Sequence, residues 1–211
     1  HTGRIPHYLS DKPLSGGFET RHNLNSDGNT TSLKLNGSEG NVAWHVDGTR
    51  KDANNYDIPG FAESAELRAL EPGEEHISGT LLGSAFTFES AAIGASYIKD
   101  WGFVGISVSD TDADYGLPGH AEGGATPTLE LAQTRTDFEL GLDKISDVIR
   151  SINLRLGVNE YEHQEIEPDG EVATRFSNKA WEARAEFIVE TGEWTHALGL
   201  QHSQRDFSAL G

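Results

Sequence analysis

Two acidic stretches of the sequence combine carboxylates with a histidine and contain no Lys or Arg. The first, residues 110–130, holds one histidine and five acids, and the second, residues 160–171, holds one histidine and six acids. Carboxylate oxygens and imidazole nitrogens suit Zn²⁺ and similar divalent ions. The metal ligands that we predict from these stretches are His120, Asp112, Asp114, Glu122 and His163.

The same acidic stretches have a second explanation that needs no coordinated metal. Clustered carboxylates on a solvated surface raise the local concentration of cations without binding any one of them. The segment Asp110-Thr-Asp-Ala-Asp114 places alternate carboxylates on one strand face, as any acidic strand end would. His120 follows the turn-prone Gly-Leu-Pro-Gly, which lifts it away from the strand end. Both interpretations stay open, and we expect no resident cofactor.

Catalytic chemistry has little support in the residue types. A nucleophile arrangement would need Ser107 or Ser109 to meet His22 and an acid, and no spacing in the sequence links them. We therefore predict no catalytic residues and no enzyme activity, and keep an enzyme as an alternative.

Composition narrows the function classes further. The net charge of -18 argues against nucleic-acid binding, because contacts to phosphate require Lys and Arg. The absence of cysteine excludes disulfides and thiolate metal sites. No run of about 18 apolar residues is present, so no transmembrane helix is predicted, and residues 1–7 lack the apolar core of a signal peptide.

Alternation of apolar and polar residues with a period of two predicts an all-β structure. Within residues 134–142, for example, Phe138, Leu140 and Leu142 share one strand face, and the face between them carries charges. The one helical candidate is residues 62–70. The nine strands that we predict are residues 17–25, 30–37, 41–52, 91–99, 103–112, 128–142, 148–163, 172–190 and 194–207.

The length of these strands and the pattern of their connections indicate a membrane barrel. Strands of globular proteins usually have about five or six residues, whereas strands that span a membrane need about nine to eleven. Tight turns at residues 38–40, 100–102, 143–147 and 191–193 alternate with longer loops at 53–90, 111–127 and 164–171. Outer-membrane barrels have short periplasmic turns and long extracellular loops. Residues 79–89 of the longest loop are expected to be partly extended.

Aromatic residues gather near the tight turns. Trp44, Tyr97, Trp101 and Trp194 all lie within a few residues of one of them. This placement is typical of an aromatic girdle at a membrane interface. The alternative is a soluble β-sandwich binding module, in which the same aromatics would close one end of the core. The mean hydropathy of -0.50 does not exclude a barrel, because only alternate residues of its strands face lipid.

The predicted fold class is therefore an antiparallel transmembrane β-barrel segment. Nine strands are an odd number, and single-chain bacterial barrels have an even number. We expect the chain to be about nine strands of a larger barrel, with further material at both ends. The polar strand faces would line its lumen, where opposite charges pair across strands; His45 is expected on that face, and His196 and His202 in the wall near the interfaces.

Several motifs resemble the first barrel hairpins of TonB-dependent outer-membrane receptors. They occur in family order along nearly the whole chain. The run 102–109, Gly-Phe-Val-Gly-Ile-Ser-Val-Ser, and the run 115–120, Tyr-Gly-Leu-Pro-Gly-His, resemble the subgroup of zinc-uptake receptors. The motifs Gln133-Thr134-Arg135-Thr136-Asp137 and Asp206-Phe207-Ser208-Ala209-Leu210-Gly211 are similar to that subgroup as well. The motifs that resemble the receptor family in general are Gly3-Arg4-Ile5-Pro6, Gly16-Gly17-Phe18-Glu19-Thr20-Arg21, Leu33-Lys34-Leu35-Asn36-Gly37, Trp44-His45-Val46-Asp47-Gly48 and Tyr56-Asp57-Ile58-Pro59-Gly60-Phe61-Ala62.

The resemblance implies a location, partners and a function. Such receptors are barrels of about 22 strands in the bacterial outer membrane, closed by an N-terminal plug. Residues 1–211 would be the N-terminal part of that barrel, without the plug and the C-terminal strands. Its partners would be outer-membrane lipid, its own plug, the remaining strands and, through the plug, the TonB energy-coupling protein.

The implied cargo is a metal ion or a metal chelate, with zinc favoured. The zinc subgroup often carries a histidine-rich loop after Gly-Leu-Pro-Gly-His, and here that loop holds only His120. A haem or siderophore receptor of the same architecture is the alternative within the family, and an outer-membrane barrel enzyme is the alternative outside it.

Overall fold

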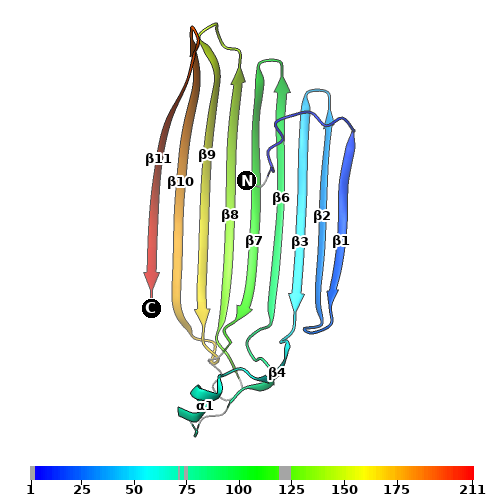
Figure 1. The fold of residues 1–211 in the computed structure, drawn as a ribbon, viewed down its shortest axis with the longest axis vertical. Coiled ribbons are helices and arrows are strands. Elements are labelled where there is room, and N and C mark those ends of the chain that lie inside the picture. The colour runs from blue at the N-terminus through cyan, green and yellow to red at the C-terminus, as the bar shows by residue number, and fades with distance from the viewer. Residues whose placement is uncertain (1–2, 71, 74–75, 119–124) are drawn as a thin grey trace.

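One antiparallel sheet contains nine strands of the chain. The computed structural model describes residues 3–70, 72–73, 76–118 and 125–211. The strand order is β1-β2-β3-β6-β7-β8-β9-β10-β11, so neighbours in the sheet follow chain order (Figure 1). The strands are β1 Leu14–Asn23, β2 Gly28–Glu39, β3 Val42–Ala53, β6 Phe86–Lys99, β7 Gly102–Gly116, β8 Thr128–Asp143, β9 Ile149–Ile166, β10 Val172–Thr191 and β11 Trp194–Leu210.

The long connection between β3 and β6 has structure of its own. It contains the short hairpin of β4 (Asp57–Phe61) and β5 (Ser78–Thr80), together with helix α1 (Ala65–Leu70). The Leu67 amide donates to Ser64 Oγ at 3.2 Å, which caps the first turn of α1. The predicted helix is confirmed, and residues 79–89 are extended in part. The boundaries of the predicted loop were wrong, because β3 continues to Ala53 and β6 begins at Phe86.

The four connections that we predicted as tight turns lie at one end of the sheet. Figure 1 shows the β2–β3, β6–β7, β8–β9 and β10–β11 connections together at the top of the view. The β1–β2 turn, the β3–β6 connection with α1, and the β9–β10 turn lie at the opposite end, the long-loop end. Gly40 and Gly192 have positive φ values of 58° and 62°, a conformation that suits glycine in a tight turn. The four predicted tight turns are confirmed, but the predicted alternation in length is right only in part, because the β1–β2 and β9–β10 connections at the long-loop end, residues 24–27 and 167–171, are short as well.

The register of the sheet sorts side chains onto two faces. Directly paired residues point to the same side, and the next residue along points to the other. One row, which we assign to the apolar face, consists of Val42, Tyr97, Val104, Leu140, Leu154, Ala185 and Leu200. The adjacent row, which we assign to the polar face, consists of Ala43, Ser96, Gly105, Glu139, Arg155, Arg184 and Gln201.

The apolar face is exposed rather than packed against a second layer. Ile93 and Leu200 keep 61% and 73% of their surface exposed, and the buried apolar residues among those described are Ile5, Ala43 and Ala92. A continuous apolar surface of this kind indicates contact with another apolar phase. On β9 the apolar positions run from Ile152 to Val158, about 20 Å along the strand, close to the apolar band of about 25 Å on membrane barrels.

These features confirm the predicted fold class and exclude the sandwich. The other sheet among the described residues has two strands and lies in a connection, so no second layer covers the nine-stranded sheet. No helix in the described part of the chain is long and apolar enough to cross a membrane.

The two faces should respond differently to a new charge. Leu154→Arg should destabilise the protein by about 2–4 kcal/mol, because it places a guanidinium in lipid near the middle of the apolar band. Its matched control is the neighbouring Asn153→Arg on the polar face, which should cost far less. Urea unfolding of the complete protein in lipid vesicles measures both. Equal losses of stability would contradict the assignment of faces.

Candidate functional site

A segment of the chain crosses the polar face of the sheet before β1 begins. We call residues 3–13 the N-terminal strap. In Figure 1 it starts in front of the middle strands and runs across β6, β3 and β2 to reach β1. Its contacts reach from Glu139 on β8 to Ser38 on β2. The polar face is therefore already occupied in part by the chain itself.

Paired polar groups anchor the strap to the wall. The Arg4 guanidinium donates to the Asp47 carboxylate, with Nε and Oδ2 at 3.1 Å. His7 Nε2 lies 2.8 Å from Glu139 Oε2, and its ring stacks on Phe103 with centroids 4.2 Å apart. The Ser10 amide donates to the hydroxyl of Ser38, and that hydroxyl donates to the Ser10 carbonyl, at 3.1 and 3.0 Å.

Small residues on β6 and β7 make room for the strap. Ile5 is only 7% exposed, although it lies on an open sheet face. A Cβ atom at Gly94 would lie 1.9 Å from the Arg4 carbonyl oxygen, and one at Gly105 would lie 2.4 Å from Ile5 Cγ2. Side chains at these positions would displace the strap, so glycine permits the close approach of the two backbones.

A hydrogen-bonded cluster lies beneath Arg4. His45 is 3% exposed, and its ring nitrogens lie 2.7 Å from Asn36 Oδ1 and 2.9 Å from Asp47 Oδ2. Asp47 thus bridges the strap and the wall, since it accepts from Arg4 and His45 together. The predicted position of His45 on the polar face is confirmed. Sequence reasoning did not foresee that the strap and Asp47 meet there.

Further ion pairs cover the polar face. Arg155 pairs with Glu139 across the β8–β9 ladder at 3.8 Å. Arg135 with Asp137 and Arg184 with Glu186 pair at 2.7 and 3.1 Å, each along a single strand. The prediction of pairing across strands is thus right for the first pair and wrong for the other two. Exposed pairs of this kind contribute little stability, and they suit a wall that faces water.

The structure does not assemble the predicted metal ligands within the described residues. Asp112 pairs with Ala132 and His163 pairs with Leu131, and these two partners are consecutive residues of β8. Asp112 and Asp114 therefore lie on the apolar side of the sheet, beyond the apolar band, whereas His163 lies on the polar side. His120 and Glu122 lie outside the described residues. No group of three or more potential ligands occurs in the part of the chain that the structure describes.

Nor does the sheet bring together the residues of a hydrolase. Ser107 and Ser109 are buried on the polar face of β7. His22 belongs to β1, and β2, β3 and β6 lie between these two strands. The barrel-enzyme alternative gains no support from this arrangement.

An aromatic row lies on the polar face near the long-loop end, and sequence reasoning missed it. We define it as Phe88, Tyr115, Tyr161, His163 and Phe176. The Tyr161 hydroxyl lies 2.8 Å from His163 Nδ1, and the rings of His163 and Phe176 lie 4.6 Å apart. A search for rings at alternate positions next to the long loops would have found this row.

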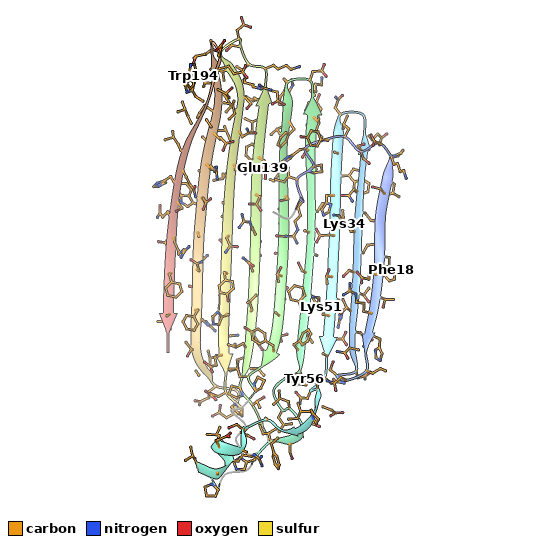
Figure 2. All side chains as sticks on the ribbon, in the orientation of Figure 1. Phe18, Lys34, Lys51, Tyr56, Glu139 and Trp194 are labelled. Carbon is orange, nitrogen blue, oxygen red and sulfur yellow. The ribbon has the colours of Figure 1, made fainter. Side chains whose placement is uncertain are left out.

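The row borders a cavity of about 530 Å³ at the end of β3, β6 and β7. Lys51 points into the same region, with Nζ 5.5 Å from the centre of the Phe88 ring. Figure 2 shows Lys51 near the end of β3 and Tyr56 just beyond it in the connection. An aromatic cavity with one cation can hold a small organic molecule, and it offers a bare metal ion no ligands of the usual kind.

Comparison with known proteins supports the fold. No protein-family model matches the sequence. The structure is similar to that of the copper transporter OprC, with a TM-score of 0.73 and 10% sequence identity over 98% of this chain. The chain spans 30% of that transporter's length. A weaker likeness, at a TM-score of 0.39 and 11% identity, covers 95% of the chain and 61% of a loop-deletion form of OmpT, an outer membrane protein of Vibrio cholerae. The expected resemblance to outer-membrane barrels is thus confirmed for the fold.

The N-terminal strap should detach from the sheet when a side chain fills the space that Gly94 leaves for it. Gly94→Leu places a side chain where the Arg4 carbonyl lies, whereas in Gly48→Leu the new Cβ meets nothing closer than 3.7 Å. In the complete protein, hydrogen exchange of the Ser10 amide, which donates to Ser38 Oγ, should become at least about tenfold faster in Gly94→Leu and stay unchanged in Gly48→Leu. Exchange in β8 and β9 reports whether the sheet is intact. Equal strap protection in both variants would show that the seat does not hold the strap.

Proposed function

We propose that this chain forms part of the wall of a TonB-dependent receptor in the bacterial outer membrane, which takes up a metal ion or a metal chelate. The observation that carries the proposal is a single long-stranded sheet with a lipid-facing side and a polar side already crossed by the chain's own strap. The sequence motifs of that receptor family add to it, and so does the fold shared with a copper transporter.

The edges of the sheet support a larger closed barrel. β1 and β11 each have one neighbour, and β11 is exposed along its whole length. Unpaired N–H and C=O groups at an edge are unfavourable in lipid, where only closed sheets satisfy them. We propose that further strands pair with both edges.

The position of the N-terminal strap also supports a location for the proposed plug. It approaches β1 from the middle of the polar face, anchored by Arg4 and His7. A plug domain joined to this segment would lie against that face, inside the barrel. In the proposed mechanism, loops at the long-loop end capture the cargo, and energy coupling through the plug moves it along the polar face.

Different observations support zinc and a metal chelate as the cargo. Zinc rests on the sequence resemblance and on His120 and Glu122, with the acids of the long-loop end as a funnel that concentrates cations. A metal chelate is favoured by one observation, the aromatic cavity beside Lys51. Catalysis has no comparable support, so transport is the function that we propose.

Energy-coupled uptake can be measured in cells. Deletion of the gene should reduce metal uptake under metal limitation, and deletion of the TonB energy-coupling protein should reduce it equally, because passage through the barrel needs that coupling. Uptake of radioactive zinc and of radioactive iron offered as chelates separates the two kinds of cargo. If the gene deletion reduces neither zinc uptake nor uptake of the iron chelates, the proposed transport is contradicted.

The zinc hypothesis has its own test in His120→Ala. If His120 coordinates zinc, this variant should lose zinc affinity, whereas the parent should keep most of its affinity in high salt, because salt does not screen ligands that are bonded directly to the metal. His196→Ala on β11 is the matched control and should bind like the parent. Zinc titration of the complete protein at low and high salt measures both. If salt abolishes binding in parent and variant alike, the loops act only as a diffuse cation funnel.

A further inference from the structure

Among the described residues, polar contacts fix the N-terminal strap to the sheet at three places. Arg4 pairs with Asp47 near one end, and Ser10 exchanges hydrogen bonds with Ser38 near the other. Arginine keeps its charge at every pH that a cell meets, and a pair of serines has no charge to lose. His7 supplies the contact between these two anchors, so the middle of the strap can respond to pH while its ends stay attached.

Both contacts of the His7 ring are stronger when the ring carries a positive charge. Its Nε2 atom lies 2.8 Å from Glu139 Oε2, and a hydrogen bond between two charged groups is stronger than one from a neutral ring. The ring also stacks on Phe103 with centroids 4.2 Å apart, and the face of an aromatic ring attracts a cation. Histidine is the side chain that ordinarily changes its charge between about pH 5 and 8. A rise in pH through this range therefore weakens both contacts at once.

Glu139 has a second cation within reach. Arg155 on β9 is its direct partner in the sheet, and Arg155 Nε lies 3.8 Å from the same Oε2 atom that contacts His7. At that distance the two groups attract each other but form no hydrogen bond. The side chain of Glu139 is only 14% exposed, so solvent screens its charge less than at an open surface. When His7 leaves the carboxylate, Arg155 can therefore take its place.

The other charged groups around His7 are already paired within the described part of the sheet. Asp137, the neighbouring residue on this face of β8, pairs with Arg135 on its own strand, and Arg184 on β10 pairs with Glu186. The strap adds Tyr8, whose ring centre lies 6.5 Å from that of His7. On β6 and β7 the residues nearest to this point carry no charge; they are Ser96, Phe103 and Gly105.

A second histidine lies near the strap but bonds to the sheet. His45 is 3% exposed, and its ring nitrogens contact Asn36 and Asp47. Asp47 also accepts from Arg4, so a change of charge at His45 reaches the strap only through that shared carboxylate. The attraction between Arg4 and Asp47 remains in either charge state of His45, because both partners keep their own charges. We therefore assign the pH response of the strap to His7.

The geometry points to a pH-sensitive latch in which Glu139 exchanges one cation for another. At acidic pH the carboxylate holds protonated His7, and the strap lies against β7 and β8. As pH rises, His7 becomes neutral, Glu139 pairs with Arg155, and the segment between Arg4 and Ser10 lifts from the sheet. Lifting this segment uncovers Phe103 and widens the space beside the polar face. The two arrangements differ in one charge, which is enough to shift the balance between them.

This inference goes beyond the proposed function, because the latch depends neither on the cargo nor on the energy-coupling protein. Figure 2 shows Glu139 in the half of β8 that leads to the tight turns, beside the strap. In the proposed barrel, the latch makes the polar face in that half more open at alkaline than at acidic pH.

The mobility of a spin label on the strap tests the latch. A nitroxide on Leu9→Cys reports the strap, and a nitroxide on Ser151→Cys in β9 reports the sheet, each in the complete protein freed of other cysteines and reconstituted in lipid. Between about pH 5.5 and 8.5, the mobile fraction at Leu9 should rise about threefold, an effect of the size expected for a partly exposed ion pair. The label at Ser151 should not change.

Two substitutions of His7 hold the latch in one position each. His7→Arg keeps a positive charge and a planar group that stacks on Phe103, so the label at Leu9 should stay immobile at both pH values. His7→Gln carries no charge and should give the larger mobile fraction at both. Arg155→Gln removes the competing cation and should lower the mobile fraction at alkaline pH, because Glu139 then has no other partner.

His45→Gln is the matched control, since it changes the other histidine near the strap and should keep the threefold rise of the parent. The latch is overturned if the parent shows no rise with pH, or if the rise survives in His7→Gln. A rise that disappears only in His45→Gln also overturns it, because the switch then acts through Asp47. The label at Ser151 shows whether each sheet is intact, and the two His7 variants decide alone if His45→Gln fails to fold. None of these results alters the uptake experiment, and a failure of uptake leaves the latch in place.

Discussion

The structure depends on one constraint, that every backbone N–H and C=O group surrounded by hydrocarbon needs a partner within the protein. Between its two edge strands, the nine-stranded ladder meets this constraint by pairing each strand with the next strand of the sheet over long, almost uninterrupted registers. The ladder also determines which face of the sheet each side chain occupies, because directly paired residues point to the same face and successive residues of a strand point to opposite faces. The apolar row through Leu154 and the polar row through Arg155 are therefore consequences of the same hydrogen bonds.

This alternation of side chains between the two faces also explains how a single sheet holds distinct functional regions. On the polar side, small residues in β6 and β7 seat the strap through Ile5, and charged residues on β3 and β8 anchor it. Closer to the long-loop end, the same side carries rings in place of small residues, and there the cavity beside Lys51 opens. Along the polar face the wall thus changes from a seat for its own chain to a cavity that can hold a small organic molecule.

The period-two pattern and the turn positions sufficed to predict an antiparallel sheet of nine long strands and the four tight turns that lie together at one end of it. It did not locate the strand ends, since β7 continues through Asp114 to Gly116, beyond the predicted end at Asp112, once the strand has left the lipid. It also failed to separate Asp112 from His163. Both lie in acidic segments at the same end, but the difference of one residue in their β8 partners sets them on opposite faces. Contacts between segments distant in the sequence, such as Arg4 with Asp47, leave no local periodic signal.

The most direct test of this account is a nitroxide scan of β9 in the complete protein reconstituted in lipid. The chain contains no cysteine, so single cysteines introduced at residues 151–159 can each be labelled without a background from this part of the protein. Accessibility to oxygen should peak at the even-numbered positions from 152 to 158, and accessibility to a polar relaxation agent should peak at the odd-numbered positions between them. A profile without two-residue alternation, or one in which the odd positions meet lipid, would contradict the assignment of the two faces and the transport route that depends on it.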